Sequence, residues 1–256
     1  MKVVAIIQAR MSSTRLPGKV LKTAGGRTIL ERMLERVQRA QTVDQVVVAT
    51  TTDPSDDAIV RASRKYGAQV FRGSLPDVLD RYYQAAKQYQ ADIVVRLTGD
   101  CPLIDPDLID EVVNALIDKQ VDFACNRLPP PFSRTYPIGL DVEACTFVAL
   151  ENAWRNADQK HEREHVLPFL YAEPGRFKVL QLNHAEDLGH LRWTLDTPED
   201  LQLLRRIYRN FKGRNDFSWL DVLALWRAKP EIFAINAQVK HKSYLESEAR
   251  QKGAKA

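Results

Sequence analysis

Short apolar runs alternate with amphipathic stretches through the first half of the chain. The runs at residues 2–8, 45–50, 69–72, 92–97 and 122–125 each have the length of a strand. They are apolar almost without interruption, as in VVAII, VVVAT and DIVVRL, which is typical of strands that are buried on both faces. The alternation predicts a three-layer α/β/α fold with a mostly parallel sheet.

The stretches between these runs carry signals for the start of a helix. Thr28 and Glu31 have the spacing of a capping box. Two Asp-Pro pairs, at residues 53–54 and 105–106, each place a capping acid before a proline in the first turn. Further helices are expected at residues 75–89, from their apolar spacing, and at residues 198–211.

The alternation stops at residues 126–137, NRLPPPFSRTYP, where three consecutive prolines exclude a helix and favour an extended excursion. Beyond it we expect helices at 148–156 and 161–171, and strands at 139–147, 177–182 and 191–195. The pattern predicts one domain over residues 1–236, with an excursion over 126–190, and a polar, lysine-rich tail over 237–256.

Composition agrees with a globular domain and adds a charge asymmetry. Of 256 residues, 45% are hydrophobic and 27% are charged, which excludes disordered, collagen-like and coiled-coil proteins. The net charge of +4 is too small to predict binding to nucleic acid or to a membrane. However, the first forty residues hold nine Lys or Arg and two Asp or Glu, so we expect an anion site near the start of the chain.

The sequence also predicts a cytoplasmic location. We find no secretory signal and no apolar run that approaches the ~20 residues of a membrane span. The three cysteines, Cys101, Cys125 and Cys145, are odd in number and lack the spacing of metal ligands. We therefore expect free thiols in a reducing compartment.

Residues 8–19, QARMSSTRLPGK, hold the densest candidate chemistry and directly follow the first expected strand. Guanidinium groups, an ammonium group, hydroxyls and a glycine that frees backbone N–H groups together suit a triphosphate. The spacing is neither that of a Walker A loop nor that of a Rossmann fingerprint. The alternative is a solvated basic loop.

The segment QARMSSTRLPGKVL resembles the N-terminal signature of the sugar cytidylyltransferases, which make CMP-linked 3-deoxy-manno-octulosonate and CMP-sialic acids, and most of all their spore-coat polysaccharide branch. The likeness continues through LTGDCPLIDP, YPIGLDVEA, EREHV and LRWTLDTPEDL, and covers about the first 205 residues. It implies a nucleotide-diphospho-sugar transferase fold, similar to GT-A, and a homodimer.

The resemblance implies Mg²⁺-dependent transfer of CMP from CTP to a sugar, with release of pyrophosphate, for a surface polysaccharide or glycan. Asp100 and Asp196, each at the end of an expected strand, would hold the Mg²⁺. Arg10, Arg15 and Lys19 would bind the β- and γ-phosphates. For Asp196 the alternative is a plain helix cap.

The resemblance also implies which residues surround the substrates. The catalytic set is Arg10, Lys19, Asp100 and Asp196. The nucleotide-binding set is Ala9, Arg10, Ser12, Ser13, Arg15, Gly18, Lys19, Arg72, Asp77 and Arg81. The last three lie in RGSLPDVLDR, where the family reads cytosine and where this chain departs from the sialate and octulosonate patterns.

For the acceptor we expect polar groups that bind sugar hydroxyls, with an arginine if the sugar is acidic. The candidates are Arg134, Tyr136, Asp141, Glu143, His165 and Arg192. His165 or Glu143 could act as the general base. The alternative for each of the six is local hydrogen bonding within an irregular segment.

Three other functions compete with this hypothesis. Residues 161–165 read HEREH, a literal H-E-x-x-H zinc pattern, but they lie in a polar run without an obvious third ligand. A GT-A-like glycosyltransferase would instead consume a nucleotide sugar. A catalytically silent nucleotide-binding protein is the third alternative.

Overall fold

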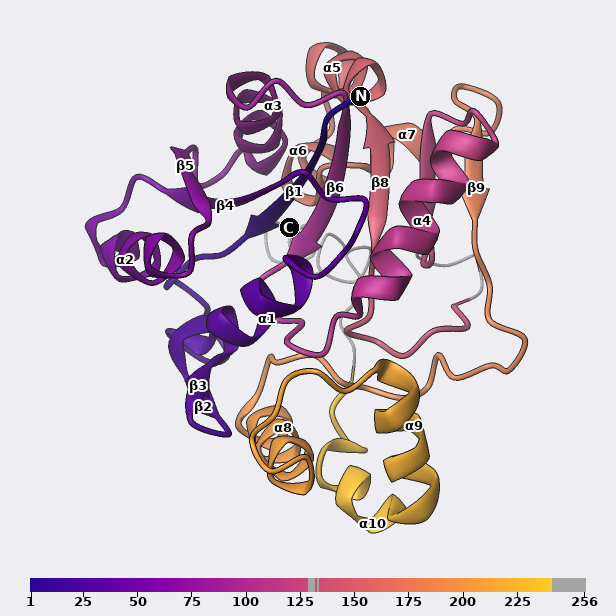
Figure 1. The fold of residues 1–256 in the computed structure, drawn as a ribbon. Helices are drawn as coiled ribbons and strands as arrows, with labels where there is room; N and C mark the ends of the chain where they lie inside the picture. The colour runs from indigo at the N-terminus through magenta and orange to yellow at the C-terminus, as the bar shows by residue number, and fades with distance from the viewer. Residues whose placement is uncertain (129–131, 133, 241–256) are drawn as a thin grey trace, which may run out of the picture.

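Seven strands form the central sheet of the computed structural model, which describes residues 1–128, 132 and 134–240 (Figure 1). Their order across the sheet is β5-β4-β1-β6-β8-β7-β9, and only β8 runs antiparallel to its neighbours. The strands are β1 (Val3–Gln8), β4 (Gln45–Thr51), β5 (Gln69–Gly73), β6 (Ile93–Thr98), β7 (Phe123–Cys125), β8 (Glu143–Thr146) and β9 (Val179–Gln181).

Helices cover both faces of the sheet. Alternate residues of β1 point to opposite faces and enter two separate cores. One face packs on α1 (Ile29–Val37), α2 (Asp57–Lys65) and α4 (Pro106–Asp118). The other packs on α3 (Val78–Gln88), α5 (Phe147–Asn156) and α7 (Pro168–Tyr171), with α6 (Lys160–His165) beside α3. The expected three-layer fold is confirmed.

Three further helices gather below the sheet in Figure 1: α8 (Pro198–Asn210), α9 (Trp219–Ala228) and α10 (Pro230–Phe233). Two fully buried arginines of α1 tie this end to the domain. Arg32 donates to the carbonyl of Gly213 at 2.8 Å, and Arg36 donates to those of Asn215 and Phe217, both at 2.9 Å. Two of the nine basic residues among the first forty are therefore buried and stabilise the packing of this region.

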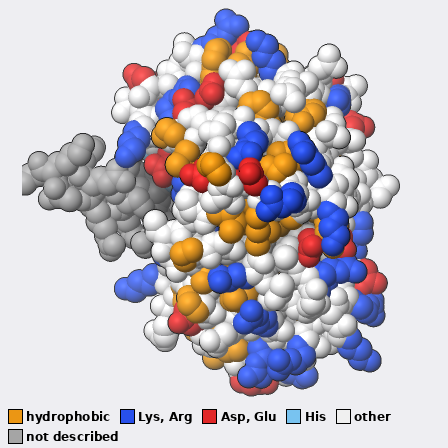
Figure 2. All heavy atoms as spheres, turned by 90° about the vertical axis from the view of Figure 1, so that its left-hand side faces the viewer, with side chains coloured by type: hydrophobic (Ala, Val, Ile, Leu, Met, Phe, Trp, Pro, Cys, Tyr) orange, Lys and Arg blue, Asp and Glu red, His pale blue; other side chains and the backbone are white. Residues whose placement is uncertain are grey.

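The remaining elements are short. A two-stranded hairpin, β2 (Thr23–Ala24) and β3 (Arg27–Thr28), lies between α2 and α8 in Figure 1. Three 3-10 helices are η1 (Lys19–Leu21), η2 (Pro54–Asp56) and η3 (Ala234–Asn236). Seen from the side of α2 and this hairpin, Lys and Arg side chains gather over the lower part of the surface (Figure 2). Arg205, Arg209 and Lys212 line a hollow next to the hairpin.

Most of the expected elements are confirmed, including the capping box, in which the Thr28 hydroxyl accepts from the Glu31 N–H at 3.2 Å. The strand expected at 191–195 is wrong: that segment is buried but forms only one isolated bridge, between Ile138 and Arg192. The helix expected over 161–171 breaks at Val166, whose φ is +76°.

The domain boundaries stay a prediction. The segment expected as an excursion, 126–190, supplies β8 and β9 to the main sheet. Of the expected tail, residues 241–256 lie outside the described part of the chain. Within the described ranges, no helix combines the length and apolar character needed to cross a membrane.

Gly139 lies where two segments of the backbone pack closely against each other. Its φ is +107°, and an added Cβ would lie 2.7 Å from backbone atoms of Trp193 and Thr194. Backbone atoms yield less than side-chain ends, so Gly139→Ala is expected to lower the free energy of unfolding by about 3 kcal/mol or more. Urea unfolding measures this change.

Gly175→Ala is the matched control, because Gly175 also has a positive φ, +84°, but nothing lies within 4 Å of an added Cβ. It carries only the backbone strain, about 1 kcal/mol. Equal losses in the two variants would show that the close approach at Gly139 is unimportant.

Candidate active site

The loop after β1 closes on the backbone of Met11. The carbonyl of Met11 accepts the N–H of Ser13 at 2.9 Å and that of Gly18 at 3.0 Å. Gly18 has a φ of +64°, which glycine adopts without strain, and it leads directly into η1 with Lys19 as its first residue. Within the described residues, the backbone N–H groups of Ser12, Thr14 and Arg15 make no hydrogen bond.

Lys19 joins this loop to two carboxylates that are distant in sequence. Its Nζ lies 2.5 Å from Oδ2 of Asp100 and 2.8 Å from Oδ1 of Asp196. Arg15 adds a second cation at 2.9 Å from Asp196. Asp100 follows β6, and its carbonyl accepts the N–H of Leu195 at 2.8 Å, which holds the two acidic segments side by side.

Asp196 is fixed from behind by a buried network. Arg192 donates to Asp196 at 2.9 Å and to both oxygens of Asp200 at 3.0 and 2.9 Å. Asn236 donates to Asp200 at 2.8 Å. The cap of α8 is Thr197, so the alternative role of Asp196 as the helix cap is wrong.

Both members of the Lys19–Asp196 pair are held charged. Burial opposes ionisation of Asp196, but Lys19, Arg192 and Arg15 outweigh it and lower the pKa of the carboxyl to about 2. Burial likewise opposes the ammonium of Lys19, yet Asp100 and Asp196 raise its pKa above the usual value. At neutral pH both Lys19 and Asp196 are therefore charged.

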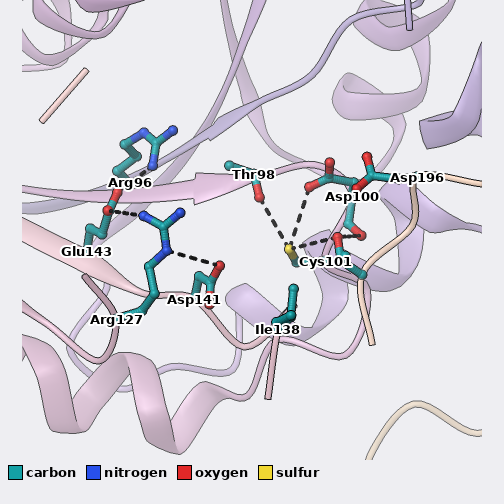
Figure 3. A pocket seen from close by; sticks show the side chains of 10 residues that line it. Arg96, Thr98, Asp100, Cys101, Arg127, Ile138, Asp141, Glu143 and Asp196 are labelled. Atoms are coloured by element: carbon teal, nitrogen blue, oxygen red, sulfur yellow. Dashed lines mark hydrogen bonds and ion pairs between the residues drawn. The ribbon is translucent and has the colours of Figure 1, made fainter. Parts of the chain in front are cut away.

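A pocket opens beside Asp100 and Asp196 (Figure 3). Its opposite wall is a chain of alternating charges: Arg96 pairs with Glu143, Glu143 with Arg127 at 3.5 Å, and Arg127 with Asp141 at 3.8 Å. The reversed direction of β8 places Glu143 opposite Arg96 of β6. The pocket therefore lies between a carboxylate pair and an ion-paired, polar wall.

Cys101 forms part of the pocket wall between these two sides. Its Sγ lies 3.2 Å from the hydroxyl of Thr98 and 3.5 Å from Asp100. Burial raises the pKa of this thiol well above its usual value, so it stays protonated and is not poised as a nucleophile. The expectation of free, buried thiols is confirmed for all three cysteines.

Two residues of the expected cytosine region are engaged within the protein. Arg72 donates to the carbonyls of Thr51 at 2.8 Å and Asp53 at 2.7 Å, and pairs with Asp57. Asp77 caps α3 and pairs with Arg163 at 2.6 Å. Neither lines the pocket of Figure 3.

Arg81 and Arg10 are less committed. Arg81 is buried and donates to the carbonyl of Ser74 at 2.8 Å, while its Nε has no hydrogen-bond partner. Burial lowers the pKa of Arg81, and the nearby charge of Arg10 acts in the same direction. Arg10 is exposed and, within the described part of the chain, forms no ion pair.

The expected acceptor residues divide into three groups. Asp141 and Glu143 line the pocket, and Arg134 pairs with Asp141. Arg192 lies behind Asp196, and His165 lies near Arg96 and Arg127, whose charges affect it. Tyr136 is buried against the rings of His184 and Trp219, at centroid distances of 5.7 Å, and is a core residue.

The sequence reasoning missed Arg96 and Arg127. A signal was present, because Arg96 interrupts an apolar strand in DIVVRL, and a charge inside a sheet buried on both faces requires a partner. The missed polar residues that line the pocket or hold Asp196 are Arg96, Thr98, Arg127, Thr194, Asp200 and Asn236.

The donor set suits magnesium better than zinc. Over residues 1–128, 132 and 134–240, no group of three or more His, Cys, Asp or Glu could hold a metal ion. In the HEREH segment, Glu162 is buried and accepts the N–H of Gln159 at 3.2 Å, as a helix-capping residue. Two carboxylates that converge on one position fit Mg²⁺, which takes phosphate oxygens and water as its other ligands.

Comparisons with known proteins show what this chain is similar to. A spore coat polysaccharide biosynthesis protein, SpsF of Bacillus subtilis, is 32% identical over 88% of this chain and 94% of its own length. The structure of a cytidylyltransferase from Leptospira borgpetersenii has a TM-score of 0.86 and 38% identity, and covers 95% of this chain and 99% of that one.

A structure of CMP:2-keto-3-deoxy-manno-octonic acid synthetase complexed with CTP has a TM-score of 0.64 over 82% of this chain and all of that one. At 21% identity, this likeness shows a shared fold. The family described as cytidylyltransferase matches residues 4–212, which is most of the chain. The chain belongs to the cytidylyltransferase family.

Proposed function

We propose that this cytidylyltransferase transfers CMP from CTP to a hydroxyl of a sugar, with Mg²⁺ as cofactor and with release of pyrophosphate. The product would serve a surface polysaccharide or glycan. The observation that carries the proposal is the convergence of Lys19, Asp100 and Asp196 beside a loop with unused donors. The polysaccharide role of SpsF and the CTP bound by the octulosonate synthetase support it.

The loop after β1 supplies the groups for the triphosphate. The unused N–H groups of Ser12, Thr14 and Arg15 can donate to phosphate oxygens. Arg10, Arg15 and Lys19 neutralise the β- and γ-phosphates and the departing pyrophosphate. Ala9, Ser12 and Ser13 lie next to the base and ribose, and Arg81 is the remaining candidate for reading cytosine.

Asp100 and Asp196 would hold the magnesium ion. When bound, the ion neutralises charge on the phosphates and favours attack at the α-phosphorus. Arg192 and Asp200 keep Asp196 in place, so the carboxylate needs no reorganisation when the substrates arrive. On binding of the metal and the nucleotide, Lys19 would exchange its ion pairs with the two carboxylates for ion pairs with the phosphates.

The pocket of Figure 3 would hold the acceptor sugar. Arg96, Arg127, Asp141 and Glu143 offer both donors and acceptors to sugar hydroxyls. Glu143 and His165 are the candidates to receive the hydroxyl proton. Burial, helped by the charge of Arg96, lowers the pKa of His165 to about 4, which makes it a weaker base than an ordinary histidine. A homodimer through residues 126–190 stays a prediction.

A thermal-shift panel of the four nucleoside triphosphates with Mg²⁺ tests the donor. Of the four nucleotides, only CTP should raise the melting temperature. A ligand that binds only the native state adds about 2.7 kcal/mol to the free energy of unfolding at a hundred times its Kd. Pyrophosphate release on addition of a sugar would then exclude a glycosyltransferase and a silent binding protein. Indifference to all four nucleotides would contradict the proposal.

Lys19→Met tests the metal site without turnover. The ammonium of Lys19 lies between the two carboxylates and would compete there with a divalent cation. Its removal should raise the affinity for Mn²⁺ alone about tenfold and weaken CTP binding by at least as much. Free Mn²⁺ is measured by electron paramagnetic resonance.

Lys22→Met is the matched control, because Lys22 directly follows the same short helix and pairs with no carboxylate in the described ranges. It should bind Mn²⁺ as the wild type does. An unchanged Mn²⁺ affinity in Lys19→Met would show that Lys19 does not guard this site.

His165 predicts an acid-side loss of stability. Its pKa is about 4 in the folded protein against 6.5 when unperturbed, so the unfolded chain binds the proton first as the pH falls. The free energy of unfolding should therefore decrease between pH 6.5 and pH 4, by up to about 3 kcal/mol. Urea unfolding of His165→Gln should lack this part of the slope; identical slopes would contradict it.

A further inference from the structure

We propose that Asp56 is the positioning residue of the nucleotide-binding loop. Asp56 ends η2, directly before α2, and its side chain is 1% exposed. The identity of the nucleotide rests on the proposed function, whereas the anchoring of the loop does not.

The carboxylate of Asp56 joins two segments of the chain. One oxygen accepts the backbone N–H of Met11 at 2.7 Å. The other accepts the hydroxyl of Thr50 at 2.9 Å and the backbone N–H of Thr51 at 3.0 Å, and also bonds the Thr51 hydroxyl. Asp56 therefore attaches the loop after β1 to the carboxyl end of β4.

Met11 is the point through which the whole loop can be held. Its carbonyl receives the N–H groups of Ser13 and Gly18, which closes the loop into a ring. Its own N–H goes to Asp56. One buried carboxylate thus fixes this ring, which carries the unused N–H groups. The ring leads directly into η1, whose first residue is Lys19.

Local structure does not explain Asp56. The side chain that caps η2 is Asp53, which accepts the N–H of Ser55 at 2.8 Å, so the turn is capped without Asp56. In the described residues no Lys or Arg forms an ion pair with Asp56, so its direct polar contacts are hydrogen bonds to the loop and to β4. Burying a carboxylate costs solvation free energy unless it is hydrogen-bonded. The four donors that bond this carboxylate belong to the loop and to β4.

A loop held before the nucleotide arrives has a lower ordering cost on binding. Without Asp56 the N–H groups of Ser12, Thr14 and Arg15 would have to be arranged by the triphosphate itself. The loss should appear mainly in CTP affinity, because Asp196 is held separately by the network around Arg192, and the backbone of Asp100 by its bond to Leu195.

Asp56→Ala and Thr50→Val form the matched pair for the test. Thr50→Val removes one bond to the same carboxylate and leaves the bond to Met11. In Asp56→Ala, hydrogen exchange at the Met11 and Gly18 amides of the free protein should accelerate about tenfold or more. CTP binding should weaken about tenfold or more, with kcat at saturating CTP within about threefold. Thr50→Val should keep wild-type values for both.

Unchanged exchange at Met11 and Gly18 in folded Asp56→Ala would overturn the proposal, and so would a CTP affinity within about twofold of the wild type. If Asp56→Ala does not fold, Asp56→Asn gives the same comparison, because its amide cannot serve both Met11 and the Thr51 N–H. If the wild type binds no nucleotide, the proposed function fails, and the exchange measurement still decides whether Asp56 anchors the loop.

Discussion

The ion pairs around Asp196 hold together the parts of this protein that matter for its chemistry. Lys19 reaches Asp196 from the start of the chain, and Arg192 reaches it from the last third. Burying such charges costs solvation energy, which their attraction only partly returns. The network is thus poor at adding stability and good at fixing position, which is what a site for a charged triphosphate needs.

The direction of one strand determines what the pocket contains. Parallel strands deliver their carboxyl ends to the same edge, and β1 and β6 bring the loop and Asp100 there. Because β8 runs the other way, it contributes its first residue, Glu143, and the chain just before it, with Asp141. The ion-paired wall of the pocket is therefore built by the segment in which the βαβ pattern breaks.

Much of this arrangement could be read from the sequence, and the failures have physical causes. Apolar runs revealed the strands because the sheet is buried on both faces. The run LRWTL at 191–195 is also apolar, and Trp193 is fully buried. A buried segment becomes a strand only where a neighbouring backbone pairs with it, and this segment forms an isolated bridge through Arg192. Side-chain networks such as that of Arg192 and Asp200 depend on tertiary contacts and leave no local pattern.

The two buried arginines of α1 depend on residues beyond the family match. The family match stops at residue 212, yet several of the carbonyls that accept from Arg32 and Arg36 lie between Gly213 and Phe217. A polypeptide that ended at residue 212 would lack these acceptors, so that Arg32 would keep only the carbonyls of Ala24 and Gly25 and Arg36 would keep that of Ile104 and its pairing with Asp105. The buried contacts that hold α1 in place therefore extend past the last residue that the family model matches.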